Sequence, residues 1–219
     1  MERNRIKTSG MYMNVLEQLG YPVEHQGLEL FTSPEWGMKA TEFYATQGVV
    51  ESDVLIGFNV GSAVPQKRWN KERFAHVADT LARDGYRIVF FGGPMDEEMV
   101  QEVIDEMQEP AIKATGAFSI GELAAAMRRC ICLVTNDSGP MHVAVSQKVP
   151  VIALFGPSNP SLYGPFTEDA IVLETMDTYD VSKNMNQVLR SGKYIGLSMI
   201  QEQEVLDAVR TMLARKGMK

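Results

Sequence analysis

Residues 134–144 decide the fold, and they read Val134-Thr135-Asn136-Asp137-Ser138-Gly139-Pro140-Met141-His142-Val143-Ala144. An apolar run, 131–134, stops at a short polar turn that ends in Gly139. Pro140 then stands where we expect the first position of a helix, because its fixed φ suits that position and its missing N–H costs nothing there. The pattern therefore predicts a buried strand, a tight loop and a helix.

The amino end of that helix is a predicted anion site. Its first N–H groups have no partner within the helix, and the helix dipole places partial positive charge there. Ser138 and Gly139 have little bulk, so a phosphate could approach these amides closely. Open α/β sheets bind ligands at the carboxyl ends of their strands, where this loop lies. An equally good local interpretation is that Asp137 or Ser138 simply caps the helix and that His142 is structural.

The composition suits one sizeable α/β domain with further segments attached, because the chain has 219 residues, of which 45% are hydrophobic. Its net charge is −7 and it has no block rich in lysine or arginine, which argues against nucleic acid as the main partner. No apolar run approaches the roughly 20 residues that a membrane helix needs. The N-terminus leads into no hydrophobic signal core.

The two cysteines, Cys130 and Cys132, lie two apart in the predicted strand. Alternate residues of a strand point to the same face, so we expect both side chains on one face, in a poor geometry for a disulfide. Both are expected to be reduced and packed, which fits a cytoplasmic protein. No cysteines and histidines are spaced as metal ligands are, so we predict no metal site.

From Asp53 onward, apolar runs alternate with segments of helical periodicity. The runs that we interpret as strands cover residues 54–60, 87–91, 111–115, 130–134, 149–155 and 170–173. This alternation predicts an α/β fold, with a Rossmann-like parallel sheet and helices on both of its faces. We expect residues 1–50 to form connector helices and an edge segment, 51–175 the Rossmann-like core, and 176–219 a loop and a closing C-terminal helix.

Glycine-rich loops follow these strands. The loops with the strongest signal are Gly61-Ser62-(x)4-Lys67-Arg68-Trp69, Asp137-Ser138-Gly139-Pro140-Met141-His142 and Phe155-Gly156-Pro157-Ser158-Asn159-Pro160. In this order and spacing they resemble glycosyltransferase family 9, the bacterial lipopolysaccharide heptosyltransferases. Each motif alone is weak, but together they are specific, and the resemblance covers nearly the whole chain.

Members of that family are GT-B enzymes, in which two Rossmann-like halves face each other across a cleft. The resemblance implies that residues 51–175 are the nucleotide-sugar-binding core of the C-terminal half, which holds a donor such as ADP-heptose. The N-terminal half holds the lipopolysaccharide-type acceptor and supplies the aspartate taken to be the catalytic base. No segment here resembles the opening of that half. We therefore expect a donor half that lacks its N-terminal acceptor half, is inactive alone, and meets the inner membrane surface only through the acceptor.

The resemblance assigns the diphosphate to residues that follow the first strand. Gly61 and Ser62 would end that strand near the diphosphate, with Ser62 donating a hydrogen bond. Lys67 would pair with a phosphate as a mobile point charge. The alternative for Lys67 is an ordinary solvated lysine, whereas Arg68 and Trp69 are expected to pack the loop.

The loop after the second strand is expected to meet the nucleoside. Gly93 would let the backbone approach it, and Asp96 or Glu97 would bind the ribose hydroxyls. An acidic residue on a first helical turn is just as often a partner of the helix dipole, so that alternative stays open for both carboxylates.

In the stretch quoted first, Ser138 and Gly139 would give backbone N–H groups to the diphosphate. Asp137 would repel a phosphate, so we expect it to orient the loop or to accept a hydrogen bond from a sugar hydroxyl. His142 is the candidate catalytic residue, which would donate to the diphosphate or to the leaving oxygen. Its alternative is a buried histidine bonded to the backbone.

The resemblance implies inverting transfer of a sugar from an ADP-linked nucleotide-sugar, without a metal ion or other cofactor. Two other functions stay open. One is a non-catalytic module that binds a nucleotide-sugar in the same cleft. The other is a GT-B-like sugar-nucleotide epimerase or hydrolase, for which only His142, Asp137 and Asp96 are available as acid–base groups.

Overall fold

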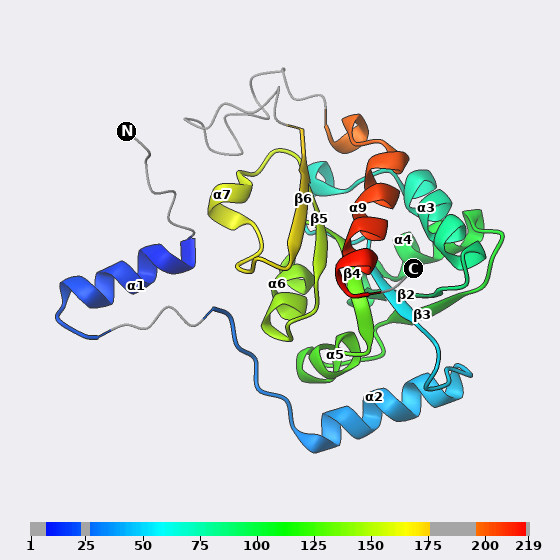
Figure 1. Ribbon diagram of the computed structural model, residues 1–219, viewed down its shortest axis with the longest axis horizontal. Coiled ribbons are helices and arrows are strands. Elements are labelled where there is room, and N and C mark those ends of the chain that lie inside the picture. The colour runs from blue at the N-terminus through cyan, green and yellow to red at the C-terminus, as the bar shows by residue number, and fades with distance from the viewer. Residues whose placement is uncertain (1–7, 23–26, 176–195, 218–219) are drawn as a thin grey trace.

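The computed structural model describes residues 8–22, 27–175 and 196–217. Its centre is one sheet of six parallel strands in the order β3-β2-β1-β4-β5-β6 (Figure 1). The strands are β1 (Leu55–Asn59), β2 (Arg87–Gly92), β3 (Ala111–Thr115), β4 (Cys130–Asn136), β5 (Val151–Phe155) and β6 (Ala170–Glu174). The predicted α/β fold with a Rossmann-like parallel sheet is confirmed.

The order of the strands reverses between β1 and β4. The chain moves outward from β1 to β2 and β3, returns to pair β4 with β1, and then moves the other way to β5 and β6. The connections after β1 and β4 therefore leave in opposite directions. Such a switch point opens a crevice at the carboxyl ends of the two strands, and ligands of open α/β sheets bind there.

Helices cover both faces of the sheet. The α-helices are α1 (Thr8–Gln18), α2 (Pro34–Thr46), α3 (Lys71–Arg83), α4 (Glu97–Glu106), α5 (Ile120–Met127), α6 (Gly139–Ser146), α7 (Pro160–Tyr163) and α9 (Glu202–Arg215). One buried cluster joins α3, α4 and α9 to the sheet, and a second joins α2, α5 and α6 to its other face. Short 3-10 turns cover Pro65–Lys67, Pro94–Asp96 and Leu197–Met199.

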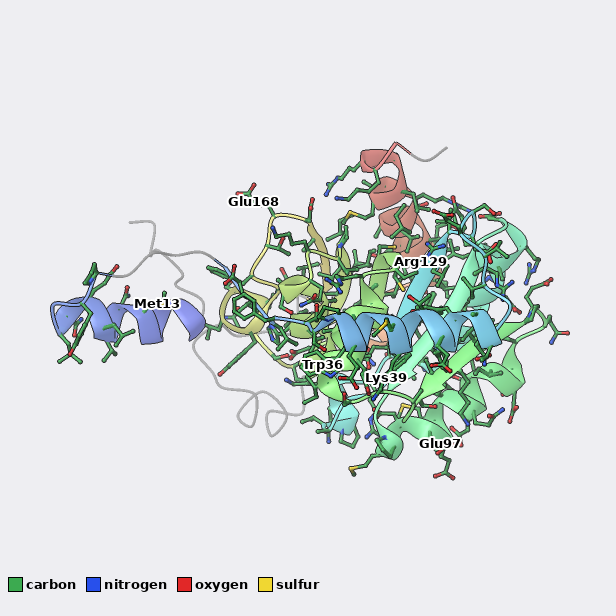
Figure 2. All side chains as sticks on the ribbon, turned by 90° about the horizontal axis from the view of Figure 1, so that it is seen from below. Met13, Trp36, Lys39, Glu97, Arg129 and Glu168 are labelled. Carbon is green, nitrogen blue, oxygen red and sulfur yellow. The ribbon has the colours of Figure 1, made fainter. Side chains whose placement is uncertain are left out.

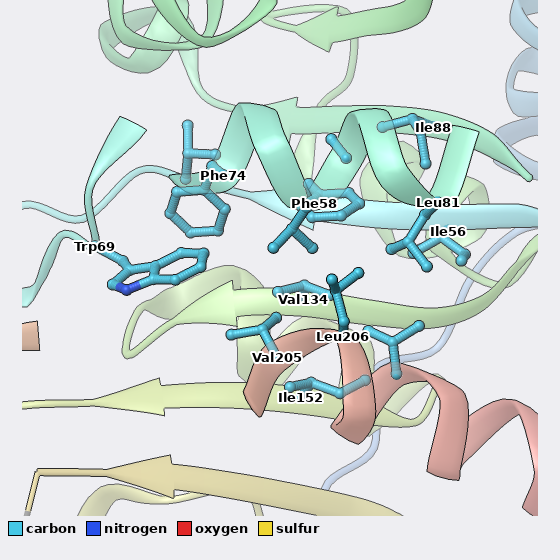
Figure 3. Close-up of a cluster of buried hydrophobic side chains, with 14 of the residues drawn as sticks. Ile56, Phe58, Trp69, Phe74, Leu81, Ile88, Val134, Ile152, Val205 and Leu206 are labelled. Atoms are coloured by element: carbon cyan, nitrogen blue, oxygen red, sulfur yellow. The ribbon is translucent and has the colours of Figure 1, made fainter. Parts of the chain in front are cut away.

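The core under α3 and α9 is built on the central strands (Figure 3). Phe58 of β1 is fully buried, and its ring centroid lies 6.4 Å from that of Phe74 and 5.4 Å from that of Phe90. Val134 and Val205 belong to the same cluster. All five residues of β1 and of β5 are buried, because helices cover both faces of a parallel sheet, and this explains their continuous apolar runs.

Helix α2 packs on α5 as an outer layer, which Figure 2 shows from below. A Cβ atom on Gly121 would lie 2.5 Å from the Trp36 ring, so the missing side chain lets the two helices approach. Lys39 Nζ lies 2.7 Å from Glu122 Oε1, and this contact lowers the pKa of the Glu122 carboxyl to about 2. Helix α5 begins with a capping box, in which Ser119 N donates to Glu122 Oε2 at 2.8 Å.

A β-bulge in β4 overturns one prediction about the cysteines. Leu55 pairs with Cys130 and Ile56 with Cys132, so Ile131 is an extra residue in β4. Cys130 consequently joins the cluster under α2, and Cys132 the cluster under α3 and α9. The prediction that both side chains point to one face was therefore wrong. Both thiols are free and buried, and burial raises the pKa of Cys130 to about 12.

The three predicted segments differ in how they meet the sheet. Within 1–50, α1 stands apart from the sheet in Figure 1, whereas α2 packs on it through α5. Most of the predicted loop, 176–195, lies outside the described residues, while α9 is part of the core. The domain boundaries stay a prediction. Within the described ranges no helix is long and apolar enough to span a bilayer.

A candidate diphosphate site at the carboxyl edge of the sheet

The amino end of α6 is formed as the sequence predicts, with one shift. The helix begins at Gly139, so Pro140 is its second residue and not its first. Ser138 occupies the N-cap position in an extended conformation, but its side chain makes no capping hydrogen bond. The hydroxyl therefore satisfies none of the first backbone N–H groups of α6, and the simple capping interpretation of this serine is wrong. A Cβ atom on Gly139 would meet nothing within 4 Å, so this end of the helix is open.

Lys67 lies beside this helix end. Its Nζ atom is 2.5 Å from Asp137 Oδ2, and the Ser158 hydroxyl donates to the same carboxylate oxygen. These residues come from the loops after β1, β4 and β5, so three segments distant in sequence meet at one point. The lysine and aspartate side chains are 17% and 7% exposed. The Lys67 ammonium therefore contacts the loop that leads into α6.

The contact also shows how the Asp137 carboxylate is held at the candidate anion site. Asp137 accepts hydrogen bonds from Lys67 and Ser158, which fix its position and offset its charge. Asp137 thereby connects the loops after β1, β4 and β5, and its two predicted roles, to orient the loop or to accept from a sugar hydroxyl, both stay predictions. The Lys67 ammonium has three N–H donors, so it can hold the carboxylate and a further anion together.

Gly61 and Ser62 are both buried at the end of β1. The Ser62 hydroxyl lies 3.5 Å from the Asp137 carbonyl oxygen and accepts from Val64 N at 3.4 Å. These long hydrogen bonds place the hydroxyl between the β1 and β4 loops. Arg68 Nε donates to the Ser62 carbonyl oxygen at 2.8 Å, which agrees with the prediction that this arginine packs the loop.

Asp96 closes the loop after β2. Its Oδ2 atom accepts from Gly93 N at 2.9 Å, so the carboxylate caps the turn that precedes α4. Its Oδ1 atom would lie 2.2 Å from a Cβ atom on Gly61, so the carboxylate rests against the β1 loop. Glu97 instead pairs with Lys113 at 3.1 Å and is exposed. The contacts of Asp96 support the structural alternative, and its binding of ribose stays a prediction.

This close approach makes Gly61→Ala a specific test of the loop geometry. The new methyl group would displace the Asp96 carboxylate and remove the partner of Gly93 N, at a cost of about 1 kcal/mol in the free energy of unfolding. Urea unfolding would measure this loss. Gly139→Ala is the matched control, because its methyl group meets nothing and alanine favours a helix. Equal stability of the two variants would contradict the assignment of Asp96 as a cap.

His142 lies in the first turn of α6 and is half-buried. Its part in catalysis stays a prediction. Within the described residues, no group of three or more His, Cys, Asp or Glu side chains is arranged to hold a metal ion.

The sequence interpretation assigned no role to several buried polar residues at this edge. They include Asn59, Thr135, Asn136 and Ser158. The first three are the last residues of β1 and β4, and Ser158 follows β5. A polar side chain at the carboxyl end of an otherwise apolar strand was the signal that could have found them.

Comparisons with known proteins show the family to which the chain belongs. The sequence profile of glycosyltransferase family 9 (heptosyltransferase) matches residues 9–194. A curated relative, lipopolysaccharide heptosyltransferase 2 of Salmonella typhimurium, is 32% identical over 168 residues, which are 74% of this chain and 48% of that protein. The chain thus spans about half the length of the curated relatives it matches.

Two solved structures extend the match to the fold. A family 9 glycosyl transferase from Veillonella parvula is 55% identical with a TM-score of 0.90, over 95% of this chain and 60% of that one. The ADP-heptose lipopolysaccharide heptosyltransferase II of Escherichia coli is 26% identical with a TM-score of 0.72, over 91% of this chain and 57% of that one. Since the family profile covers most of the sequence, the chain belongs to glycosyltransferase family 9.

Proposed function

We propose that this chain binds the nucleoside diphosphate of a sugar donor, an ADP-heptose type of molecule, for inverting transfer to a lipopolysaccharide-type acceptor. One observation carries the proposal: the Lys67 ammonium lies on Asp137, two residues before the open amino end of α6. A cation and a set of helix N–H groups at one point favour a diphosphate. The name of the Escherichia coli structure, an ADP-heptose enzyme, supports the choice of nucleotide.

In this proposal the chain stabilises the leaving group. An acceptor hydroxyl loses its proton and attacks the anomeric carbon, while the bond to the nucleoside diphosphate breaks and negative charge grows on the diphosphate. Lys67, the backbone N–H groups of Ser138 and Gly139 and the His142 side chain then act on that charge. A helix end contributes only about 0.3–2 kcal/mol to binding an anion, so several donors must act together. No step in this scheme uses a metal ion.

The general base and the acceptor site are proposed to lie in the other half of the complete enzyme. The chain spans about half the length of its curated relatives, and the described edge of the sheet offers its donors to the diphosphate. On this proposal the 219 residues bind the donor without transferring the sugar, they work in the cytoplasm, and only the acceptor brings the enzyme to the inner membrane.

Calorimetric titration of the chain with ADP, UDP and GDP tests the proposal. We expect one site for ADP, with heat that persists when EDTA is present, because the proposed donors are protein groups. Incubation with ADP-heptose should leave the donor intact by mass spectrometry, which separates donor binding from hydrolysis or epimerisation. Absence of heat with all three nucleotides would overturn the assignment of the site.

A further inference from the structure

Two buried asparagines end the two central strands at the point where the strand order reverses. Asn59 is the last residue of β1 and Asn136 the last of β4, and the two strands are paired in the sheet. Their exposed fractions are 1% and 0%. Burying an amide is costly unless it is hydrogen-bonded, so the partners of these two side chains show what they hold in place.

Asn59 reaches from β1 into the loop that begins α6. Its Nδ2 atom lies 2.8 Å from Ser138 Oγ and 3.2 Å from Thr135 Oγ1, and it also donates to the Gly61 carbonyl oxygen at 3.2 Å. One amide group therefore contacts its own loop and the N-cap residue of α6. The contacts link Gly61 to Ser138, two residues that the family resemblance places near the same diphosphate.

Asn136 makes the reciprocal connection. Its Nδ2 atom donates to the Val60 carbonyl oxygen at 2.8 Å, and its Oδ1 atom accepts from Trp69 N at 3.1 Å. Both partners belong to the loop after β1, and they bracket the segment that carries Lys67. Each strand thus ends in an amide that holds the loop of the other strand.

The buried Asn59 amide lowers the stability of the fold in a way that an apolar side chain would not. Among the described residues, the Asn59 Oδ1 atom is buried without a hydrogen-bond partner. A buried acceptor left unpaired lowers stability. The two asparagines nevertheless fix the geometry of the two loops. Loops that are already fixed lose less conformational entropy when a ligand binds, so binding is favoured.

We propose that Asn59 and Asn136 are positioning residues that hold the Lys67 loop and the amino end of α6 in register for the diphosphate. The inference rests on the proposed function, since it names the residues that prearrange that site. Neither amide needs to touch the ligand. Asn59 acts through Ser138 and Gly61, and Asn136 acts through the backbone on either side of Lys67.

Titration of ADP into Asn59→Ala tests this inference, with urea unfolding measured in parallel. We expect roughly tenfold weaker binding, which corresponds to the loss of one or two hydrogen bonds. Thr135→Val is the matched control. It removes one acceptor of the Asn59 amide and the hydrogen bond from the Thr135 hydroxyl to the Asn136 carbonyl oxygen. The contacts of Asn59 with Ser138 and Gly61 remain, so the affinity should change less than about threefold.

A double-mutant cycle separates positioning from a general loss of stability. Ser138→Ala removes the nearest partner of Asn59 at a half-buried site, so it tests the same link even if Asn59→Ala fails to fold. Because the two residues act as one unit, the double variant should bind ADP little more weakly than the weaker single variant. Wild-type affinity in folded Asn59→Ala, or strict additivity in the cycle, would overturn the inference. No ADP binding by the wild type would instead overturn the proposed function.

Discussion

Lys67→Met should weaken the binding of ADP roughly 10- to 100-fold without unfolding the protein. A hydrogen bond to a charged group contributes about 1.5–3 kcal/mol, and each 1.4 kcal/mol is a factor of ten in affinity. The methionine keeps most of the aliphatic length of lysine but removes its charge. Lys67 belongs to none of the buried hydrophobic clusters of the described residues, so we expect the core to stay folded without its charge.

The size of this effect comes from two contributions that act in the same direction. The diphosphate loses a cationic partner, and Asp137 loses the charge that offsets its own. The Asp137 carboxylate would then repel the ligand at short range from a largely buried position, where water screens charge poorly. Ser158 still donates to it, but a neutral hydroxyl does not cancel the charge.

Calorimetry with ADP measures this prediction, and Lys71→Met is the control. Lys71 follows Lys67 by one short segment at the start of α3, and it pairs with Glu102 at 3.3 Å on the exposed surface. Exposed pairs of this kind contribute about 0–1 kcal/mol, so this variant should bind ADP almost normally. Equal losses in the two lysine variants would mean that general charge attraction, and not the contact at Asp137, holds the nucleotide.

Local pattern was enough to predict most of the fold. The strand from Ala111 to Thr115 has the predicted bounds, and β1 differs from its prediction by one residue at each end. Those runs are apolar because both faces of the sheet are covered, and a glycine or polar turn closes each one. The bulge at Ile131 could not be predicted, because it depends on how β4 pairs with β1 and not on the composition of β4.

The site was predicted only where one loop carries its own signal. The small residues Ser138 and Gly139, which stand just before Pro140, predict the start of a helix. The contact of Asp137 with both Lys67 and Ser158 joins residues 70 and 21 positions away, so no local pattern contains it. The predicted strands place all three residues at the same edge of the sheet. Which of them are in contact depends on the packing of the loops, which the sequence pattern does not give.

Trp69→Ala should lower the free energy of unfolding by about 3–5 kcal/mol, the usual cost of removing a buried aromatic ring. Trp69 is 3% exposed, and its ring centroid lies 4.9 Å from that of Phe74 in an edge contact. Its Nε1 atom donates to the Ile200 carbonyl oxygen at 3.1 Å. The tryptophan therefore joins the loop that carries Lys67 to α3 and to the segment that enters α9.

Thermal unfolding should show this loss as a fall in Tm of roughly 6–20 °C for a chain of this size. Trp69→Phe is the matched variant, since it keeps an aromatic edge on Phe74 and removes the Nε1 donor. Ile200 still accepts from Arg73 Nη1 at 2.5 Å, so we expect this variant to lose only about 1–2 kcal/mol. If Trp69→Ala and Trp69→Phe lose the same free energy of unfolding, the Nε1 hydrogen bond and not the packing of the ring would hold the loop. That result would contradict the assignment of the buried ring as the group that fixes the Lys67 loop on the core.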